Sequence, residues 1–218
     1  MKNHTGNNMR GADRGRLIVG VTGATGTIYA VRLLQALQEL RVESHLVLSK
    51  WGARTLLHET PYSLEQVQRM ASHSYAPKDQ GAAIASGSFV TRGMVICPCS
   101  VRSLAEIAHG SGSTLLHRAA DVVLKERRKL VLLVREAPLS DIHLENMLKL
   151  SRMGAVIFPP VPAFYTHPQT IDDIVGQTVM RVLDQFEVHL SSRKRWDGIM
   201  STTGSSTEKG LLAPKHRR

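Results

Sequence analysis

The sequence predicts an α/β protein in which a doubly wound parallel sheet is covered by helices on both faces, giving three layers. Short apolar runs alternate with amphipathic helical segments along the chain, and this alternation is typical of parallel sheets. The clearest run, residues 130–134, is apolar at every position, as expected for a strand that is buried on both faces.

The amino-terminal half is expected to hold two strands and three helices. The run LIVGV predicts a strand at residues 17–21, and HLVL predicts another at 45–48. Apolar residues three or four apart predict helices at 27–40, 53–59 and 63–70. The small residues of GAAIASGSF then interrupt the pattern, so residues 72–92 are expected to form a loop that suits a lid or a flat ligand.

The carboxyl-terminal half continues the alternation. The run MVIC predicts a strand at residues 94–97, followed by a helix at 101–108. A helix at 119–128 is expected to lead into the strand at 130–134. The remaining elements are a helix at 141–153, a short strand at 155–158 and a closing helix at 171–186.

The length of 218 residues, of which 42% are hydrophobic, suits one domain with a sizeable core. We expect this domain to span residues 16–196. Residues 1–15 and 197–218 are polar, contain glycine and cations, and show no periodicity, so both are expected to be disordered extensions. No apolar run approaches membrane-spanning length, and the protein is expected to be cytoplasmic.

The charge and the cysteines exclude some classes of function. Much of the net charge of +10 lies near the two ends, without an RNA-binding aromatic motif, zinc-finger spacing or helix-turn-helix pattern, so nucleic acid is not expected as the ligand. Cys97 and Cys99 lie at a strand end and fit a reducing cytosol. No second CxxC or HxxxH cluster accompanies them, so no metal site is expected.

A glycine-rich turn follows the first strand. In VTGATG, Gly23 and Gly26 flank Ala24 and Thr25 before a helix begins, and such a turn offers backbone N–H groups to an anion. The spacing from Gly20 also occurs in dehydrogenases that bind nicotinamide dinucleotides. The chain has no YxxxK pair, and Ser49 and Lys50 end the second strand in place of an acidic ribose ligand, which counts against that class.

The segment RAADVVLKERRKLVLLVREAP carries the strongest functional pattern. Arg118 and Lys125 lie two turns apart on one helix face, so both can reach one anion. Arg135 and Glu136 fall where the next strand ends, and ligands of open α/β sheets bind at the carboxyl ends of strands. The segment therefore offers groups for holding a phosphate and moving a proton.

Three other residues have both structural and functional interpretations. Glu59 is either a solvated carboxylate near a helix end or a proton-handling group, and Ser100 is either an ordinary helix N-cap or a ligand of an anion. Tyr165, in the stiff loop FPPVPAFYTHP, is either a surface anchor or a hydroxyl aimed at a ligand. Arg181 is most simply a solvated helical residue.

Taken together, several motifs in this order resemble the UbiX-like flavin prenyltransferases, which were formerly described as aromatic or phenylacrylic acid decarboxylases. The resemblance covers residues 16–196 and rests on TGATG, LVLSK, HET, ASGSF, MVICPCS, RAADVVLKERRKLVLLVREAPLS, HLENMLKLSRMGAVI, PPVPAFYTHPQT and RVLDQF. It implies a flavodoxin-like subunit that assembles into a dodecamer, with each active site built between neighbouring subunits.

The resemblance also implies a reaction. Such enzymes join a dimethylallyl group from dimethylallyl phosphate to N5 and C6 of reduced FMN, without a metal ion. The product, prenylated FMN, serves UbiD-like decarboxylases. The implied FMN ligands are Gly23, Ala24, Thr25, Ser49, Ser100, Val101, Arg102, Ser103 and Arg135.

The implied ligands of the prenyl phosphate are Arg118, Lys125, Tyr165 and Arg181. Glu59 and Glu136 are the implied proton-handling residues, and the hydroxyl of Thr25 belongs to the same catalytic group. Two rival functions are an FMN-dependent decarboxylase related to the cysteine-decarboxylating flavoproteins, and a non-catalytic carrier that delivers FMN to a partner decarboxylase.

Overall fold

The computed structural model describes residues 15–190 and residue 195. Strands and helices alternate along the chain, as predicted. The elements are β1 (Arg16–Val21), α1 (Thr27–Glu39), β2 (Glu43–Leu48), α2 (Lys50–Glu59), α3 (Leu64–Met70), β3 (His73–Tyr75), the 3₁₀ turn η1 (Ala83–Ala85), β4 (Gly93–Cys99), α4 (Val101–Ala108), α5 (Leu115–Lys125), β5 (Lys129–Val134), α6 (Asp141–Arg152), β6 (Val156–Ile157) and α7 (Ile171–Asp184).

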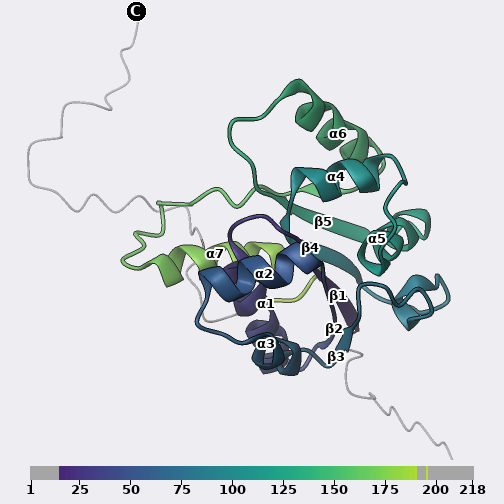
Figure 1. Cartoon of the computed structure of the whole chain (residues 1–218). Coiled ribbons are helices and arrows are strands. Elements are labelled where there is room, and N and C mark those ends of the chain that lie inside the picture. The colour runs from purple at the N-terminus through teal and green to yellow at the C-terminus, as the bar shows by residue number, and fades with distance from the viewer. Residues whose placement is uncertain (1–14, 191–194, 196–218) are drawn as a thin grey trace, which may run out of the picture.

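The six strands form one parallel sheet with the order β3-β2-β1-β4-β5-β6. Without the three-residue edge strand β3, this order is the flavodoxin-like one. Helices α1, α2, α3 and α7 lie on one side of the sheet, and α4, α5 and α6 lie on the other (Figure 1). The predicted fold class is therefore confirmed.

Neighbouring residues of each strand point to opposite faces and build two separate apolar cores. Val19 and Val95 pack against α1 and α7, whereas Ile18 and Met94 pack against α4 and α5. Cys97 and Cys99 are both buried within these layers. Burial raises the pKa of the Cys99 thiol to about 12, so it stays protonated, and the prediction of small buried residues is confirmed.

Two helices differ most from the prediction. The helix expected at 53–59 begins at Lys50, because the Ser49 hydroxyl caps it by accepting a hydrogen bond from the Gly52 N–H. The helix expected at 119–128 is displaced and runs Leu115–Lys125, with its early apolar residues buried. It ends before Arg127, whose φ of 56° is incompatible with a helix.

The loop expected at residues 72–92 contains strand β3 and the turn η1. Strand β3 has exposed or half-exposed side chains and no apolar run, so its sequence gives no strand signal. It forms by pairing with β2, and the side chains of Ser44 and Ser72 each accept a hydrogen bond from the other residue's backbone N–H at 3.1 Å.

Apart from Gly15, the expected disordered extensions lie outside the described residues. Among the helices that the structure describes, none combines the length and the apolar character needed to cross a membrane.

Candidate functional site

The carboxyl ends of β1 and β4 mark the place where a ligand-binding crevice is expected in this fold. The chain leaves β1 toward α1 on one face and leaves β4 toward α4 on the other, and such a reversal point is the usual ligand site of an open α/β sheet. The buried Thr22 hydroxyl joins the two loops, donating to the Pro98 carbonyl at 2.9 Å and accepting from the Ser100 N–H at 2.7 Å. This contact fixes the floor of the crevice.

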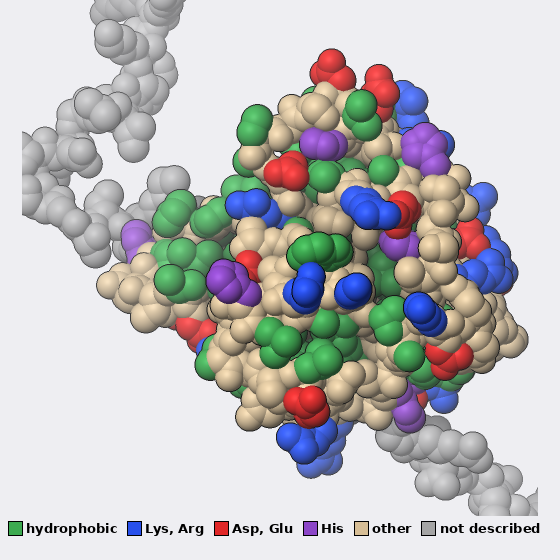
Figure 2. All heavy atoms as spheres, viewed as in Figure 1, with side chains coloured by type: hydrophobic (Ala, Val, Ile, Leu, Met, Phe, Trp, Pro, Cys, Tyr) green, Lys and Arg blue, Asp and Glu red, His purple; other side chains and the backbone are tan. Residues whose placement is uncertain are grey.

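The glycine-rich turn lies on one side of this crevice. Gly23 and Thr25 are exposed, and Ala24 is buried. A Cβ at Gly23 would come within 2.5 Å of the Cβ of Trp51, so the close approach of α2 requires glycine at this position. Trp51 itself is 62% exposed, and Figure 2 shows Lys and Arg side chains among apolar ones over the face that carries α2.

The side chain of Glu59, the last residue of α2, lies at the amino terminus of α1. Its Oε2 accepts hydrogen bonds from the Gly26 N–H at 2.9 Å, the Thr27 N–H at 3.0 Å and the Thr27 hydroxyl at 2.9 Å. Burial of the Glu59 carboxyl acts to raise its pKa, but hydrogen bonds from Thr25, Thr27 and Gly26 together prevail and lower it. Glu59 is therefore an ionised acceptor, and α1 already holds an anion at the turn where a ligand anion was expected.

The amino terminus of α4 offers a second place for an anion. Ser100 caps this helix by accepting from the Ser103 N–H at 3.3 Å. Val101 is half-buried at the first helical position, whereas the side chain of Arg102 points to solvent and pairs with Glu106 at 2.9 Å. The structure thus confirms Ser100 as an N-cap and places this helix end, with its positive dipole, beside Thr22 in the crevice.

Three further predicted residues lie at the same edge of the sheet. Ser49 is half-buried and directly follows β2. Arg135 and Glu136 are exposed and follow β5, with the Arg135 N–H bonded to the Cys99 carbonyl at 3.1 Å. The structure therefore brings the predicted flavin-binding turns, Glu59 and Glu136 to one edge.

The predicted phosphate ligands on α5 are farther from this edge. Both side chains are exposed and form ion pairs with acidic residues close to them in the sequence. Arg118 contacts Asp121 at 2.7 Å, and Lys125 contacts Glu126. Lys125 ends α5 only four residues before the first residue of β5, so it lies near the amino-terminal edge of the sheet. A Cβ at Gly87 would come within 2.9 Å of Lys125 Nζ, so the ASGSF loop lies beside it.

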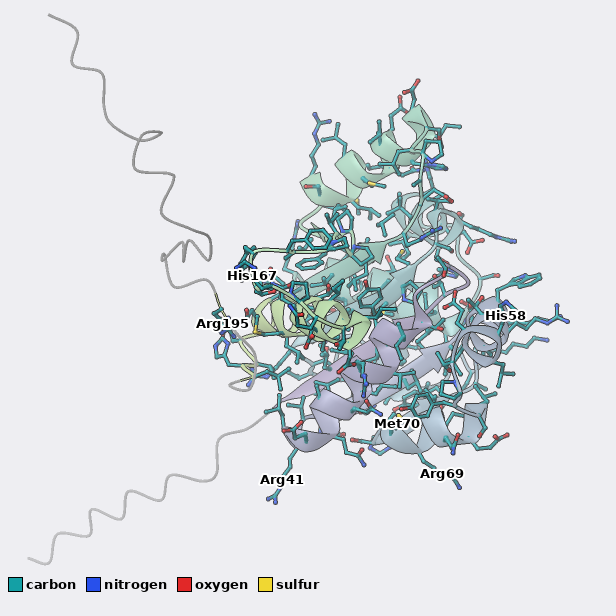
Figure 3. All side chains as sticks on the ribbon, turned by 90° about the vertical axis from the view of Figure 1, so that its left-hand side faces the viewer. Arg41, His58, Arg69, Met70, His167 and Arg195 are labelled. Carbon is teal, nitrogen blue, oxygen red and sulfur yellow. The ribbon has the colours of Figure 1, made fainter. Side chains whose placement is uncertain are left out.

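The other two predicted phosphate ligands lie along α7. The Tyr165 hydroxyl accepts a hydrogen bond from Gln177 Nε2 at 3.0 Å, which places it over this helix. Arg181 follows Gln177 by four residues, so the two lie on one helix face. Arg181 lies 3.5 Å from Asp184, which also binds Arg195 at 2.7 Å beside α7 (Figure 3).

The four predicted phosphate ligands are thus divided between the two faces of the sheet. Helix α5 packs into the core that contains α4 and α6, and α7 packs into the core that contains α1 (Figure 1). Because the sheet separates these helices, one subunit does not bring the two pairs together. The structure leaves the four assigned roles as proposals.

Sequence reasoning missed some polar residues that shape the site. Thr22 lies between β1 and the glycine-rich turn. Its position directly after a buried strand was the feature of the sequence that could have identified it. His117 is buried beside Ser103, with its Nε2 2.9 Å from Glu106. Burial lowers the pKa of His117, so its ring is neutral at pH 7. Gln177 and His117 gave no sequence signal, because both lie within otherwise apolar helix faces.

Comparisons with known proteins identify the family of this chain. The flavoprotein family model matches residues 6–183. A probable UbiX-like flavin prenyltransferase of Bacillus subtilis is 53% identical over 197 residues, covering 90% of this chain and 97% of that protein.

Two solved structures are also similar. AnUbiX in complex with FMN and dimethylallyl pyrophosphate has a TM-score of 0.84 and 48% identity, covering 86% of this chain and all of that one. A dodecameric FMN-dependent UbiX-like decarboxylase from Escherichia coli O157:H7 has a TM-score of 0.82 and 58% identity, covering 84% of this chain and all of that one. The chain therefore belongs to the flavoprotein family and, within it, to the UbiX-like flavin prenyltransferases.

Proposed function

We propose that this chain is a flavin prenyltransferase, which joins a dimethylallyl group from dimethylallyl phosphate to N5 and C6 of reduced FMN. The observation that carries the proposal is the likeness, at 48% identity, to a structure that contains FMN and dimethylallyl pyrophosphate. The product, prenylated FMN, would be released to a UbiD-like decarboxylase. Reduced flavin supplies the nucleophilic ring atoms of this chemistry.

The phosphate end of FMN is proposed to bind at the switch point between β1 and β4. The amino terminus of α4 presents the Ser100 hydroxyl and backbone N–H groups, and a helix dipole favours an anion there. At the amino terminus of α1, the Glu59 carboxylate already neutralises the positive end of the helix dipole. The amino terminus of α4 is therefore the better binding site for the FMN phosphate. Thr25, Ser49 and Arg135 surround the same edge and would orient the flavin.

The divided set of phosphate ligands supports a site between subunits. Arg118 and Lys125 lie on one face of the sheet, and Tyr165 and Arg181 lie on the other. All four side chains can surround one phosphate if the site forms where different copies of the chain meet. The dodecameric relative offers the precedent, and we propose the same assembly for this chain. Several cations and a hydroxyl would then stabilise the charge that develops on the leaving phosphate.

Two carboxylates are suited to proton transfer. The lowered pKa of Glu59 favours an acceptor, and its contact with Thr25 would align that hydroxyl toward the crevice. Glu136 is exposed at the end of β5, where it can exchange protons with solvent. We assign Glu136 to removal of the proton from the flavin C6 position, and Glu59 with Thr25 to proton transfer near the phosphate.

The location and the remaining partners follow from this function. The free thiols of Cys97 and Cys99 suit a reducing compartment, and we propose that the protein works in the cytoplasm. Its ligands would be small molecules, without nucleic acid or a membrane.

The test is an anaerobic incubation of the purified protein with reduced FMN and dimethylallyl phosphate, followed by mass spectrometry of the released flavin. A mass gain of one five-carbon prenyl unit, and activation of an apo UbiD-like enzyme, are the expected results. Unmodified FMN in a preparation that binds flavin would contradict the proposal and favour the carrier or decarboxylase function.

A variant separates catalysis from flavin binding. Glu136→Ala is expected to bind FMN with unchanged affinity but to form no prenylated flavin, whereas Glu145→Ala on the exposed face of α6 should behave as the wild type. Wild-type turnover by Glu136→Ala would refute the assigned role.

A further inference from the structure

Three side chains with metal-binding atoms meet at the amino-terminal edge of the sheet. Glu43 and His45 are two residues apart on β2, so they point to the same face, and His73 pairs with His45 in the register of β2 and β3. His45 Nε2 lies 3.0 Å and His73 Nε2 lies 3.5 Å from Glu43 Oε1. All three ligand atoms lie within 4.8 Å of one another. We name this group the β2–β3 histidine cluster.

Two of the three side chains are held by further partners. The Tyr75 hydroxyl lies 2.9 Å from His45 Nδ1, and Arg16 Nε donates to Glu43 Oε2 at 3.1 Å. Metal-binding histidines and carboxylates usually have such outer partners, which fix the ring and the carboxylate. When His45 Nε2 binds a cation, its remaining proton lies on Nδ1 and is donated to Tyr75. Arg16 leaves Oε1 of Glu43 free for the same cation.

The exposure of the cluster suits capture of an ion from solvent. The ring of His45 is 1% exposed and is fixed between Tyr75 and Phe89, whereas the side chains of Glu43 and His73 are 38% and 55% exposed. The two imidazole rings are stacked with 16° between their planes, so their nitrogen lone pairs lie in nearly parallel planes. A turn of the exposed His73 side chain lets both nitrogens converge on one ion.

We propose that the β2–β3 histidine cluster binds a divalent first-row transition metal ion, with Zn²⁺ as the probe ion. Two imidazole nitrogens and one carboxylate oxygen suit zinc, copper, nickel or cobalt better than calcium or magnesium, which prefer oxygen ligands. Three protein ligands leave one tetrahedral position for water. The ion joins β2 to the short edge strand β3, so binding stabilises this edge of the sheet.

The cluster is separate from the crevice assigned to FMN. His45 lies four residues before Ser49 on a parallel strand, a distance of about 13 Å along β2. The proposal therefore does not depend on prenyl transfer. The sequence did not predict it, because residues 43, 45 and 73 match no linear metal motif and meet only through strand pairing.

The experiment uses the full chain without an affinity tag, stripped with a chelator and titrated with Zn²⁺ against a chromophoric competitor. The expected result is one Zn²⁺ per chain, with a higher melting temperature in its presence. Co²⁺ should give the strong visible absorption of tetrahedral coordination. Absence of Zn²⁺ binding at micromolar concentrations would overturn the proposal.

Matched variants locate the bound ion. His73→Gln removes an exposed ligand without disturbing the core, and we expect its affinity for Zn²⁺ to fall more than roughly ten-fold, since loss of an outer partner alone costs about that much. Tyr75→Phe removes only the outer partner of His45 and should weaken binding roughly ten-fold. His58→Gln changes an exposed histidine of α2, which points away from the ribbon in Figure 3, and should bind as the wild type. Equal affinity in His73→Gln and the wild type would refute the assignment.

Discussion

The contact of Glu59 with the start of α1 leads to a prediction that does not depend on catalysis. Helix α1 begins after Gly26, whose φ of 99° is left-handed and which offers no side-chain cap. Glu59, from the end of α2, supplies the missing acceptor across 33 positions of sequence. Removal of its charge should therefore destabilise the junction of α1 and α2.

The size of the effect follows from the bonds lost. Glu59→Ala removes three hydrogen bonds of 2.9–3.0 Å to a charged acceptor. Loss of a helix cap costs about 0.5–2 kcal/mol. Loss of a negative charge at a helix amino terminus adds about 0.3–1 kcal/mol. A total of about 1–3 kcal/mol corresponds to a fall in melting temperature of roughly 3–9 °C for a domain of this size.

Glu59→Gln keeps an oxygen acceptor but loses the charge, so a smaller loss of about 1 kcal/mol, or roughly 2–4 °C, is expected. The pH dependence has a definite sign. The pKa of Glu59 is lowered in the folded protein, so its stabilisation is complete above the unfolded pKa and is lost as the pH falls through the folded pKa. The difference between wild type and Glu59→Gln should therefore be full at neutral pH and shrink below about pH 4.3.

Thermal melting followed by circular dichroism, at neutral pH and at several acidic pH values, measures this difference. Glu145→Gln, on the exposed face of α6, is the matched control and should melt with the wild type at each pH. If Glu59→Gln and the wild type had the same melting temperature at neutral pH, the carboxylate would not cap α1 in solution, and the reasoning would be refuted.

Three other substitutions test the site. Thr22→Val leaves the half-buried Ser100 N–H without its acceptor, at a cost of about 1–3 kcal/mol, and should lower both the melting temperature and the affinity for FMN in a fluorescence titration. Gly52→Ala would place a Cβ 2.5 Å from the Val21 carbonyl oxygen, so calorimetry should show a loss of about 1–3 kcal/mol. Tyr165→Phe should raise the KM for dimethylallyl phosphate in steady-state assays while FMN affinity stays unchanged; an unchanged KM would remove the residue from the phosphate site.

The sheet could be predicted because its central strands are continuous apolar runs. All six residues of β5 except Lys129 are buried, and this burial on both faces is what the run of apolar residues indicated. Strand β3 could not be predicted in this way, because its residues are exposed and its pairing with β2 is decided by contacts across the sheet. The observed helix boundaries differ from the predicted ones because helix caps such as Ser49 are polar and do not belong to the apolar periodicity on which the prediction depends.

The edge of the candidate site was also predictable, because residues that follow parallel strands must meet at one edge of the sheet. Arg135 and Glu136 were placed at this edge by this rule, whereas the glycine-rich turn pointed to Thr25 and a helix start pointed to Ser100. The state of Glu59 was not predictable, since a carboxylate near a helix end is usually solvated. Only the fold brings the end of α2 against the start of α1, and this contact makes Glu59 an ionised acceptor.

The proposed phosphate ligands show the remaining limit of reasoning from one chain. Arg118 and Lys125 share a face of α5, and this much follows from helical spacing. Spacing within one chain does not reveal that Arg181, on α7, and Tyr165, which contacts α7 through Gln177, lie on the other face of the sheet. Because the sheet keeps the two pairs apart, a monomeric variant should retain the FMN crevice yet lose prenyl transfer. Flavin binding and turnover should therefore respond separately to loss of assembly, whereas a site contained within one subunit would keep both.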